Sequence, residues 1–264
     1  MEKQDNSQML TFSGHLDVLR KIIIRLVVVT LSISLIIFCI KDFVFDVILS
    51  PSSSNFITYR IIEQILSIFG SSFRFNDFCV ELISTDLSAQ FMTHVSTSLY
   101  IGLLLSLPYI LFELFRFISP ALYEDEKRYS KWIVIIVYVL FLIGLLMSYY
   151  IIFPISFRFL GTYSVAEVVK STITIKSYIS TFISLSLVIG LVFQLPVITY
   201  ILGKLGVITA KMLSHYRKHA LLILTFVAAI ITPPDILSCI LVTLPLYLLF
   251  EISIRVLRRV KMSS

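Results

Sequence analysis

The stretch from Trp132 to Phe157 reads WIVIIVYVLFLIGLLMSYYIIFPISF and contains no Lys, Arg, Asp or Glu. As a helix it would be about 39 Å long, and about 20 apolar residues suffice to cross a hydrocarbon core about 30 Å thick. Leu87–Phe112 and Ser177–Gly203 are similarly long and free of charge. Each of the three stretches therefore predicts a membrane-spanning helix.

Three shorter stretches lack charged residues as well, at Leu26–Ile40, His219–Pro234 and Ile236–Phe250. Hydrophobic residues make up 58% of the 264 residues, and charged residues only 14%, against about 25% in an ordinary soluble domain. This composition excludes a cytosolic globular enzyme, a disordered chain and a secreted disulfide scaffold. The cysteines are odd in number and far apart, so they form neither a disulfide framework nor a metal-ligand spacing; they are Cys39, Cys79 and Cys239.

The distribution of positive charge orients the chain. Most Lys and Arg residues fall into four clusters: Lys3, Arg20, Lys21 and Arg25; Arg116, Lys127, Arg128 and Lys131; Lys204, Lys211, Arg217 and Lys218; and Arg255, Arg258, Arg259 and Lys261. If the clusters share one side, the positive-inside rule makes that side the cytoplasm. Both termini are then cytoplasmic, which requires an even number of spans. The net charge of +6 follows the membrane, so no nucleic-acid partner is expected.

Parity also decides how the C-terminal region crosses the membrane. The apolar region from Ala220 to Phe250 is interrupted at Thr232-Pro233-Pro234-Asp235, and adjacent prolines disfavour a continuous helix. Basic clusters flank the region at both ends. We therefore predict a hairpin of two short helices, with the bilayer locally thinned or a partner covering the mismatch.

These patterns predict an all-α polytopic membrane protein with six transmembrane helices in one integral membrane domain, residues 1–264. The predicted helices are roughly 22–40, 88–115, 132–154, 178–202, 219–232 and 236–254. The N-terminus is polar and no small-x-small cleavage site follows the first apolar run, so the first helix is expected to be retained. An extracytoplasmic cap loop, about 41–87, is expected to contain a short amphipathic helix at Tyr59–Phe69. Four prolines are expected to kink the helices into a curved bundle; they are Pro108, Pro154, Pro196 and Pro245.

No nucleotide-binding, dinucleotide-binding or HExxH motif occurs, so we expect no enzyme activity, cofactor or metal. The notable residues are polar groups at membrane depth and acids near the basic clusters. Gln194 lies in an apolar helix next to Pro196. Its amide either bonds across to a neighbouring helix or awaits a partner helix. His94 is expected at the membrane interface.

Glu124-Asp125-Glu126 precedes Lys127-Arg128 in the loop between the second and third spans. This run is either a solvated charged surface or a set of carboxylates that binds a guanidinium, and fork geometry would then distinguish Arg from Lys. Asp17, close to Arg20, adds an acid on the same side. Asp235 is expected to cap the following helix.

The order of several short motifs resembles TatC, the multispanning subunit of the twin-arginine protein translocase. The motifs are His15-Leu16 with Leu19-Arg20, Ser84-Thr85-Asp86, FISPALYEDEKR at 117–128, Phe153-Pro154, Phe193-Gln194-Leu195-Pro196, Thr232-Pro233-Pro234-Asp235 and Phe250-Glu251. They extend over nearly the whole chain.

The resemblance implies a concave helical bundle that serves as a receptor in the bacterial cytoplasmic membrane and binds signal peptides bearing two adjacent arginines. Folded proteins would then cross the membrane using the proton gradient. The implied partners are the single-span proteins TatA and TatB and membrane lipid, and self-association is expected as well. Glu126 matches the family's loop glutamate for the arginine pair, and Phe117 matches a phenylalanine of the same motif. Further matches are a proline of the outer loop, a polar residue within the fourth helix and an aspartate of the outer hairpin, at Pro51, Gln194 and Asp235.

Two positions depart from the family pattern. The family has His-Leu-x-Glu-Leu-Arg before the first helix, but this chain has Val18 at the acid position and Asp17 one residue earlier. Glu124 and Asp125 are alternative replacements for that acid. After Pro-Pro-Asp, Cys239 stands where the family has Gln.

A small-solute secondary transporter is the alternative function, because helical bundles with intramembrane polar groups also serve transporters. Against it, the sequence shows no inverted repeat and no paired broken helices in corresponding halves.

Overall fold

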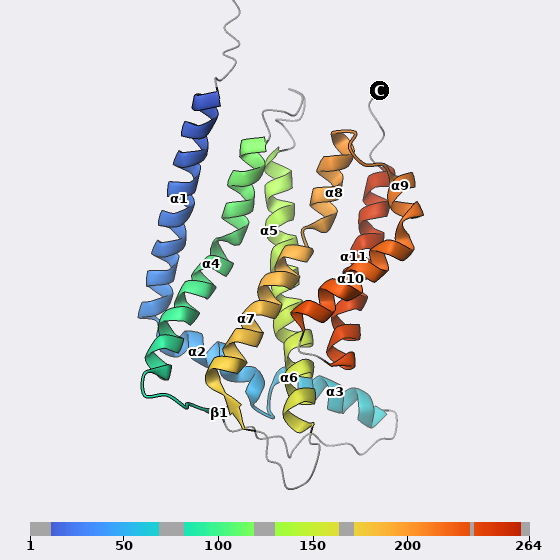
Figure 1. Ribbon diagram of the computed structural model, residues 1–264. Coiled ribbons are helices and arrows are strands. Elements are labelled where there is room, and N and C mark those ends of the chain that lie inside the picture. Colours follow the sequence, from blue (N-terminus) through green and yellow to red (C-terminus); the bar gives the residue numbers. More distant parts are fainter. Residues whose placement is uncertain (1–11, 69–81, 119–129, 164–171, 233–234, 260–264) are drawn as a thin grey trace, which may run out of the picture.

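The computed structural model describes residues 12–68, 82–118, 130–163, 172–232 and 235–259. Long helices run side by side between two ends of the molecule (Figure 1). They are α1 (Phe12–Cys39), α4 (Ala89–Ile118), α5 (Ser130–Met147), α7 (Ile175–Val192), α8 (Leu195–Lys204), α10 (Arg217–Ile231) and α11 (Ile236–Arg259). α1 begins, and α11 ends, at the same end of the bundle (Figure 1).

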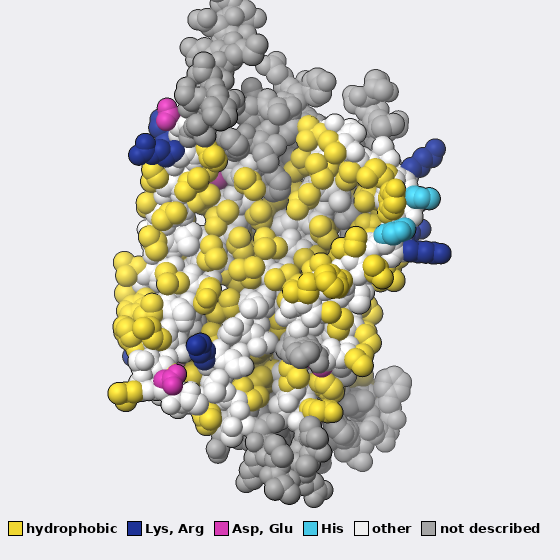
Figure 2. Space-filling model, viewed as in Figure 1, with side chains coloured by type: hydrophobic (Ala, Val, Ile, Leu, Met, Phe, Trp, Pro, Cys, Tyr) yellow, Lys and Arg dark blue, Asp and Glu magenta, His cyan; other side chains and the backbone are white. Residues whose placement is uncertain are grey.

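We call this end the basic end, because helix termini rich in Lys and Arg meet there. The start of α1, the end of α8, the short helix α9 (Ala210–His215) and the end of α11 all lie at it (Figure 1). Figure 2 shows hydrophobic side chains over most of the visible face, with Lys and Arg chiefly near the start of α1 and beside α9. The other end of the bundle is called the outer end.

Five helices are long and apolar enough to cross a membrane, judged by length and composition within the described ranges. They are Asp17–Cys39, Ala89–Leu114, Val134–Thr162, Ile175–Lys204 and Ser238–Arg259. α10 has 15 residues and is therefore about 23 Å long, which is less than the thickness of the hydrocarbon core. The number of six spans therefore remains a prediction.

Several helices extend beyond their predicted bounds. α1 begins at Phe12 rather than near residue 22, and α11 continues to Arg259 rather than ending near 254. The predicted bounds stopped both helices where charged residues begin. Charged side chains do not break a helix, because Lys, Arg and Glu have good helix propensity, so both helices continue into water. The last helix is accordingly longer than its apolar stretch.

Prolines mark the irregular points of two helices. α5 continues through a π-helical segment, η4 (Ser148–Ile152), into α6 (Phe153–Thr162). Pro154 has no N–H to donate to the carbonyl of Tyr150, and the Thr58 hydroxyl donates to that carbonyl instead. α7 and α8 are separated at Phe193 and Gln194, directly before Pro196. Irregular geometry thus occurs at two of the four predicted prolines.

The outer end is covered by short elements that cross beneath the long helices (Figure 1). They are α2 (Lys41–Leu49), η1 (Ser50–Ser52) and α3 (Ile57–Ile68), together with a short parallel pair of strands, β1 (Leu82–Ile83) and β2 (Ile173–Thr174). α3 corresponds to the expected amphipathic helix. α2 and β1 were not predicted, because the region 41–87 was read as a loop around that helix. β2 was not predicted either, because no element was assigned between the third and fourth predicted spans.

The core lies between α7, η4, α6 and α11, and its largest buried side chains include Phe153, Tyr178, Leu185 and Leu246. Tyrosines also join the cap to this core. The hydroxyls of Tyr149 and Tyr178 donate to carbonyls in the last turn of α2, at 2.7 Å each. Carbonyls at a helix C-terminus lack partners within the helix, so these bonds fix α2 against the bundle.

α1 packs along α4 in antiparallel orientation (Figure 1). A Cβ on Gly102 would lie 2.0 Å from the Ser34 hydroxyl oxygen, so only glycine permits this approach. Thr30 and Ser106 share a hydrogen bond of 2.9 Å across the same interface. Small residues and hydroxyl pairs are typical of helix packing in lipid.

Candidate functional site

At the basic end, an ion pair joins α1 to α4. Arg25 Nη1 lies 2.9 Å from Glu113 Oε1, and the Tyr109 hydroxyl donates to the same oxygen at 3.0 Å. Glu113 is only 3% exposed, whereas about half of the Arg25 side chain is exposed. A buried carboxylate is stable only when a positive charge and hydrogen bonds compensate it.

Sequence reasoning missed the Arg25–Glu113 pair. Arg25 directly precedes the first uncharged stretch, and Glu113 directly follows the second. Consecutive spans run in opposite directions, so these boundaries were bound to lie at the same end of the bundle. An arginine and a glutamate at two such boundaries were therefore the signal in the sequence that could have predicted the pair.

A second ion pair at the basic end joins α10 to α11. Arg217 Nε lies 2.8 Å from Glu251 Oε1, and Arg217 Nη2 donates to Glu251 Oε2 at 3.0 Å. The guanidinium thus lies close to both carboxylate oxygens, but only the Nη2 contact is a hydrogen bond, because Arg217 Nε has no hydrogen-bond partner among the described residues. Glu251 belongs to the Phe250-Glu251 motif of the sequence.

The predicted peptide-binding residues fall partly outside the described ranges. Asp17 and Arg20 lie in the first turns of α1, and both are exposed. Phe117 belongs to the last turn of α4, four residues after Glu113. Glu124, Asp125 and Glu126 lie outside the described residues. The chain leaves α4 at Ile118 and enters α5 at Ser130, and both helix termini are at the basic end (Figure 1).

Gln194 lies at the break between α7 and α8 and is 1% exposed. Its Nε2 donates to the carbonyl of Val137 in α5 at 3.2 Å, while its Oε1 is buried and has no hydrogen-bond partner within the described part of the chain. The first predicted alternative, a bond across to a neighbouring helix, is therefore seen at the amide nitrogen. The second alternative, that the side chain awaits a partner helix, stays a prediction.

Pro51 is buried at the outer end, where Tyr59 of α3 joins the cap to the third span. The Tyr59 hydroxyl lies 3.0 Å from the carbonyls of both Pro51 and Pro154, and the Arg158 guanidinium lies over its ring at 5.2 Å. Burial raises the pKa of Tyr59 above its ordinary value, an effect that Arg158 partly offsets. Tyr59 was not singled out in the sequence.

Two other predicted residues have local roles. Asp235 Oδ1 accepts a hydrogen bond from the Ser238 backbone N–H at 2.6 Å, which confirms the expected helix cap. His94 lies near the outer end of α4, where its ring stacks on Phe38 at 4.1 Å and its Nε2 lies 3.1 Å from the Phe38 carbonyl oxygen. Pro108 lies within α4 and is buried.

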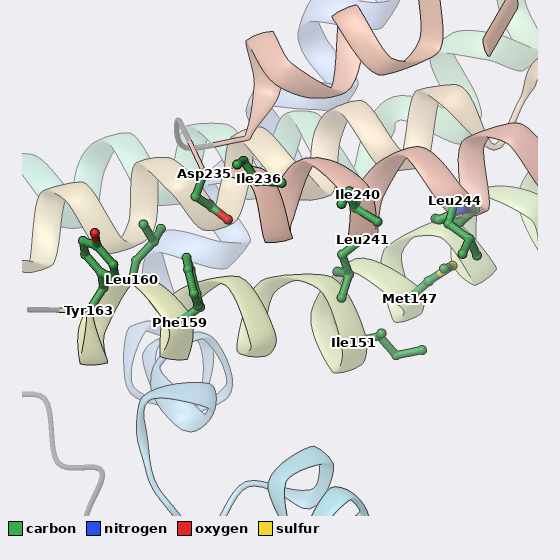
Figure 3. Close-up of a pocket in the computed structure, with 11 residues that line it drawn as sticks. Met147, Ile151, Phe159, Leu160, Tyr163, Asp235, Ile236, Ile240, Leu241 and Leu244 are labelled. Atoms are coloured by element: carbon green, nitrogen blue, oxygen red, sulfur yellow. The ribbon is translucent and has the colours of Figure 1, made fainter. Parts of the chain in front are cut away.

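A groove of about 960 Å³ runs between α5–α6 and α11. Figure 3 shows Asp235, Phe159, Leu160 and Tyr163 toward one end of it and Met147 and Leu244 toward the other. Almost all of its lining is apolar. Among the described residues, no group of three or more His, Cys, Asp or Glu side chains could hold a metal ion.

Comparison with known proteins decides the family. The sequence model of the family described as "Sec-independent protein translocase protein (TatC)" matches residues 14–245. The chain belongs to the TatC family. It is therefore a multi-pass membrane protein related to the components of Sec-independent protein translocases, and the resemblance to TatC seen in its sequence motifs is confirmed.

Individual relatives cover the chain almost completely. The TatC protein of Blattabacterium sp. subsp. Periplaneta americana is 36% identical over 256 residues, covering 96% of each chain. That of Carboxydothermus hydrogenoformans is 30% identical over 253 residues, covering 96% of this chain and 94% of its own. The crystal structure of the twin arginine translocase receptor TatC superposes with a TM-score of 0.72 at 31% identity, covering 92% of this chain and 98% of the other.

A second crystal structure of that receptor, in the detergent DDM, gives a TM-score of 0.75 at 30% identity. It covers 92% of this chain and 99% of its own. The helical, polytopic fold predicted from the uncharged stretches is thus the TatC fold. Membership of a protein translocase family also favours protein transport over the small-solute transporter that the composition alone left open.

Proposed function

We propose that this TatC protein binds signal peptides with two adjacent arginines at its basic end. It then nucleates assembly with single-span partners of the TatA and TatB kind, and the assembly exports folded proteins using the proton gradient. The chemistry is charge-assisted hydrogen bonding rather than bond breaking. The proposed residues are Glu126, Phe117, Glu124, Asp125, Asp17 and Arg20.

The Arg25–Glu113 pair is the observation that supports this proposal most. It ties α1 to the last turns of α4, and Phe117 follows Glu113 by one helical turn. The pair therefore fixes the helix that bears Asp17 and Arg20 against the helix that leads into the acidic loop. It also provides an internal example of a carboxylate that binds a guanidinium at this end of the molecule.

Guanidinium geometry explains why the signal would contain arginine rather than lysine. Arg presents five N–H donors in a planar fork, whereas Lys presents a compact ammonium group. Among the described residues, the two ion pairs at the basic end each join an arginine to a glutamate, and in the Arg217–Glu251 pair two guanidinium nitrogens lie within 3.0 Å of the carboxylate oxygens. Loop carboxylates of the same kind would favour an Arg-Arg peptide over a Lys-Lys peptide.

Peptide affinity tests the proposal. A hydrogen bond to a charged group contributes about 1.5–3 kcal/mol. We therefore expect Glu126→Gln to lower the affinity for an Arg-Arg peptide by about ten- to a hundredfold. The measurement is a fluorescence-anisotropy titration of the detergent-solubilised protein. Glu63→Gln, in α3 at the outer end, is the matched control and should leave the affinity unchanged. Equal affinity of the unsubstituted protein for Arg-Arg and Lys-Lys peptides would overturn the proposal.

The orientation and the partner surface belong to the same proposal. We infer a bacterial cytoplasmic membrane location with the basic end and both termini in the cytoplasm, as the positive-inside rule requires. Gln194 is inferred to accept a hydrogen bond from a partner helix, because its Oε1 finds no partner among the residues that the structure describes. Pro51, Pro108 and Asp235 are inferred to maintain the shape of the surfaces on which partners assemble.

A further inference from the structure

The groove between α5–α6 and α11 has a carboxylate at its outer end. Asp235 Oδ1 caps α11 through Ser238, but Asp235 Oδ2 is buried and has no hydrogen-bond partner among the described residues. Figure 3 shows the Asp235 side chain directed toward the side of α6, near Leu160 and Phe159. An unpaired carboxylate oxygen against apolar side chains is unfavourable, so the site favours a ligand that brings positive charge and N–H donors.

The length of the groove indicates the size of that ligand. Along α5, η4 and α6 its lining extends from Met147 to Tyr163, which is about 24 Å of helix. Along α11 it extends from Asp235 to Pro245, or about 15 Å. One leaflet contributes about 15 Å of hydrocarbon and about 20–22 Å with its headgroup region. A spanning helix would need the full depth of about 30 Å, so a ligand of one leaflet's length fits better.

The polarity of the groove is arranged like that of a phospholipid. Asp235 and the exposed Tyr163 lie at the outer end, where headgroups would lie. Ile240, Leu241 and Leu244 continue the groove toward the middle of the helices (Figure 3), where acyl chains would lie. The ligand that completes this arrangement has two apolar chains and an ammonium headgroup.

We propose that the groove binds one aminophospholipid, of the phosphatidylethanolamine type, from the leaflet at the outer end. Its ammonium group donates to Asp235 Oδ2, and its acyl chains lie along α6 and α11. Phosphatidylcholine has no N–H to donate and phosphatidylglycerol has no cation, so both bind more weakly. This site does not depend on peptide binding at the basic end.

Quenching by brominated lipids tests the proposal on the full chain in detergent–lipid micelles. In a Trp132→Phe background, which removes the only tryptophan, Ile240→Trp places an indole in the groove. We expect chain-brominated phosphatidylethanolamine to quench it at about two- to fivefold lower mole fraction than brominated phosphatidylcholine or phosphatidylglycerol. Asp235→Asn should abolish this preference while retaining a capping oxygen.

Leu248→Trp in the same background is the control, because Leu248 is exposed on α11 but does not line the groove. Its quenching should not depend on the headgroup. Equal quenching by the three lipids at Ile240→Trp would overturn the proposal, and so would a preference that survives Asp235→Asn. Crosslinking of a single-span partner helix at position 240 with no headgroup preference would instead assign the groove to a protein. If Asp235→Asn does not fold, the comparison of lipids with Asp235 intact still decides.

Discussion

Glu113 illustrates how much a single residue determines at the basic end. Its carboxylate is buried beside Tyr109 and binds Arg25 across the α1–α4 interface. Charged side chains at membrane depth pair with one another or face the interior of the bundle. Glu113 faces the interior of the bundle and pairs with Arg25, so its negative charge holds α1 against α4.

Removing one member of this pair should loosen α1. We predict that Arg25→Met lowers the unfolding temperature in detergent more than Arg217→Met does, because Glu113 is more deeply buried than Glu251. Differential scanning fluorimetry measures both variants. Since the two residues form one interaction, adding Glu113→Gln to Arg25→Met should cost little more. A larger loss for Arg217→Met would show that burial does not govern these pairs.

Gln194 gives a second prediction at this scale. Replacing it with Leu removes the bond to Val137, and such bonds between membrane helices contribute about 0.6–2 kcal/mol. We expect Gln194→Leu to leave Arg-Arg peptide affinity unchanged but to reduce crosslinking of a single-span partner to α7 and α8. Gln194→Glu, which keeps an acceptor oxygen, should restore the crosslink. Unchanged crosslinking in Gln194→Leu would contradict the partner role.

Some residue roles were predictable because they are local, and others were not. The cap at Asp235 depends only on the residues that follow it, so the sequence predicted it. The role of Tyr59 depends on Pro154, which is distant in sequence, and no local pattern indicates such a contact. The bond from Gln194 to Val137 was foreseen only as one of two alternatives, because a sequence does not specify which neighbouring helix supplies an acceptor.

Among the elements, the long helices were predictable and the cap was not. Uncharged stretches of 26 or 27 residues have few alternatives to a spanning helix in lipid. α2 has Lys41, Asp42 and Asp46 among apolar residues, and its stability depends on carbonyl bonds from Tyr149 and Tyr178. An element such as α2, which is stabilised by contacts with distant residues, has no clear hydrophobic pattern of its own and is therefore hard to predict from sequence.

The junction between α3 and the third span yields a prediction about stability and pH. Tyr59 is 1% exposed, and its hydroxyl lies within hydrogen-bond distance of two carbonyls. Tyr59→Phe should lower the free energy of unfolding by about 1–3 kcal/mol. Tyr138→Phe, at a half-exposed position in α5, is the control and should cost almost nothing. Unfolding by denaturant in micelles measures both.

The same hydroxyl determines a pH dependence. Its pKa is raised by burial, so above the ordinary tyrosine pKa of about 10 the unfolded chain loses this proton while the folded chain keeps it. The contribution of Tyr59 is therefore complete below about pH 10 and is lost as the pH rises further. The difference in stability between Tyr59→Phe and the unsubstituted protein should shrink between pH 9 and pH 11. A constant difference would contradict this assignment.

At the scale of the whole molecule, charge and hydrophobicity divide the bundle into two ends with different roles. The basic end contains both arginine–glutamate pairs and the helix termini that border the acidic loop. The outer end contains the cap, its tyrosine bonds and the groove with Asp235. Counting Lys and Arg in the sequence predicted this division, because topology places every second helix boundary at the same end. The side-chain contacts within each end could not be predicted from the sequence, because they join residues that are far apart in the chain.

We propose that the basic end faces the cytoplasm and receives the arginine pair of a signal peptide. A cysteine placed beside Glu126, as Lys127→Cys, provides the test by maleimide labelling, in a chain whose Cys39, Cys79 and Cys239 are replaced by Ser. An impermeant maleimide should label position 127 in inside-out vesicles but not in intact spheroplasts. Because Glu126 is retained, an Arg-Arg peptide should slow the labelling more than a Lys-Lys peptide. Labelling from the outside, or equal protection by the two peptides, would contradict the proposal.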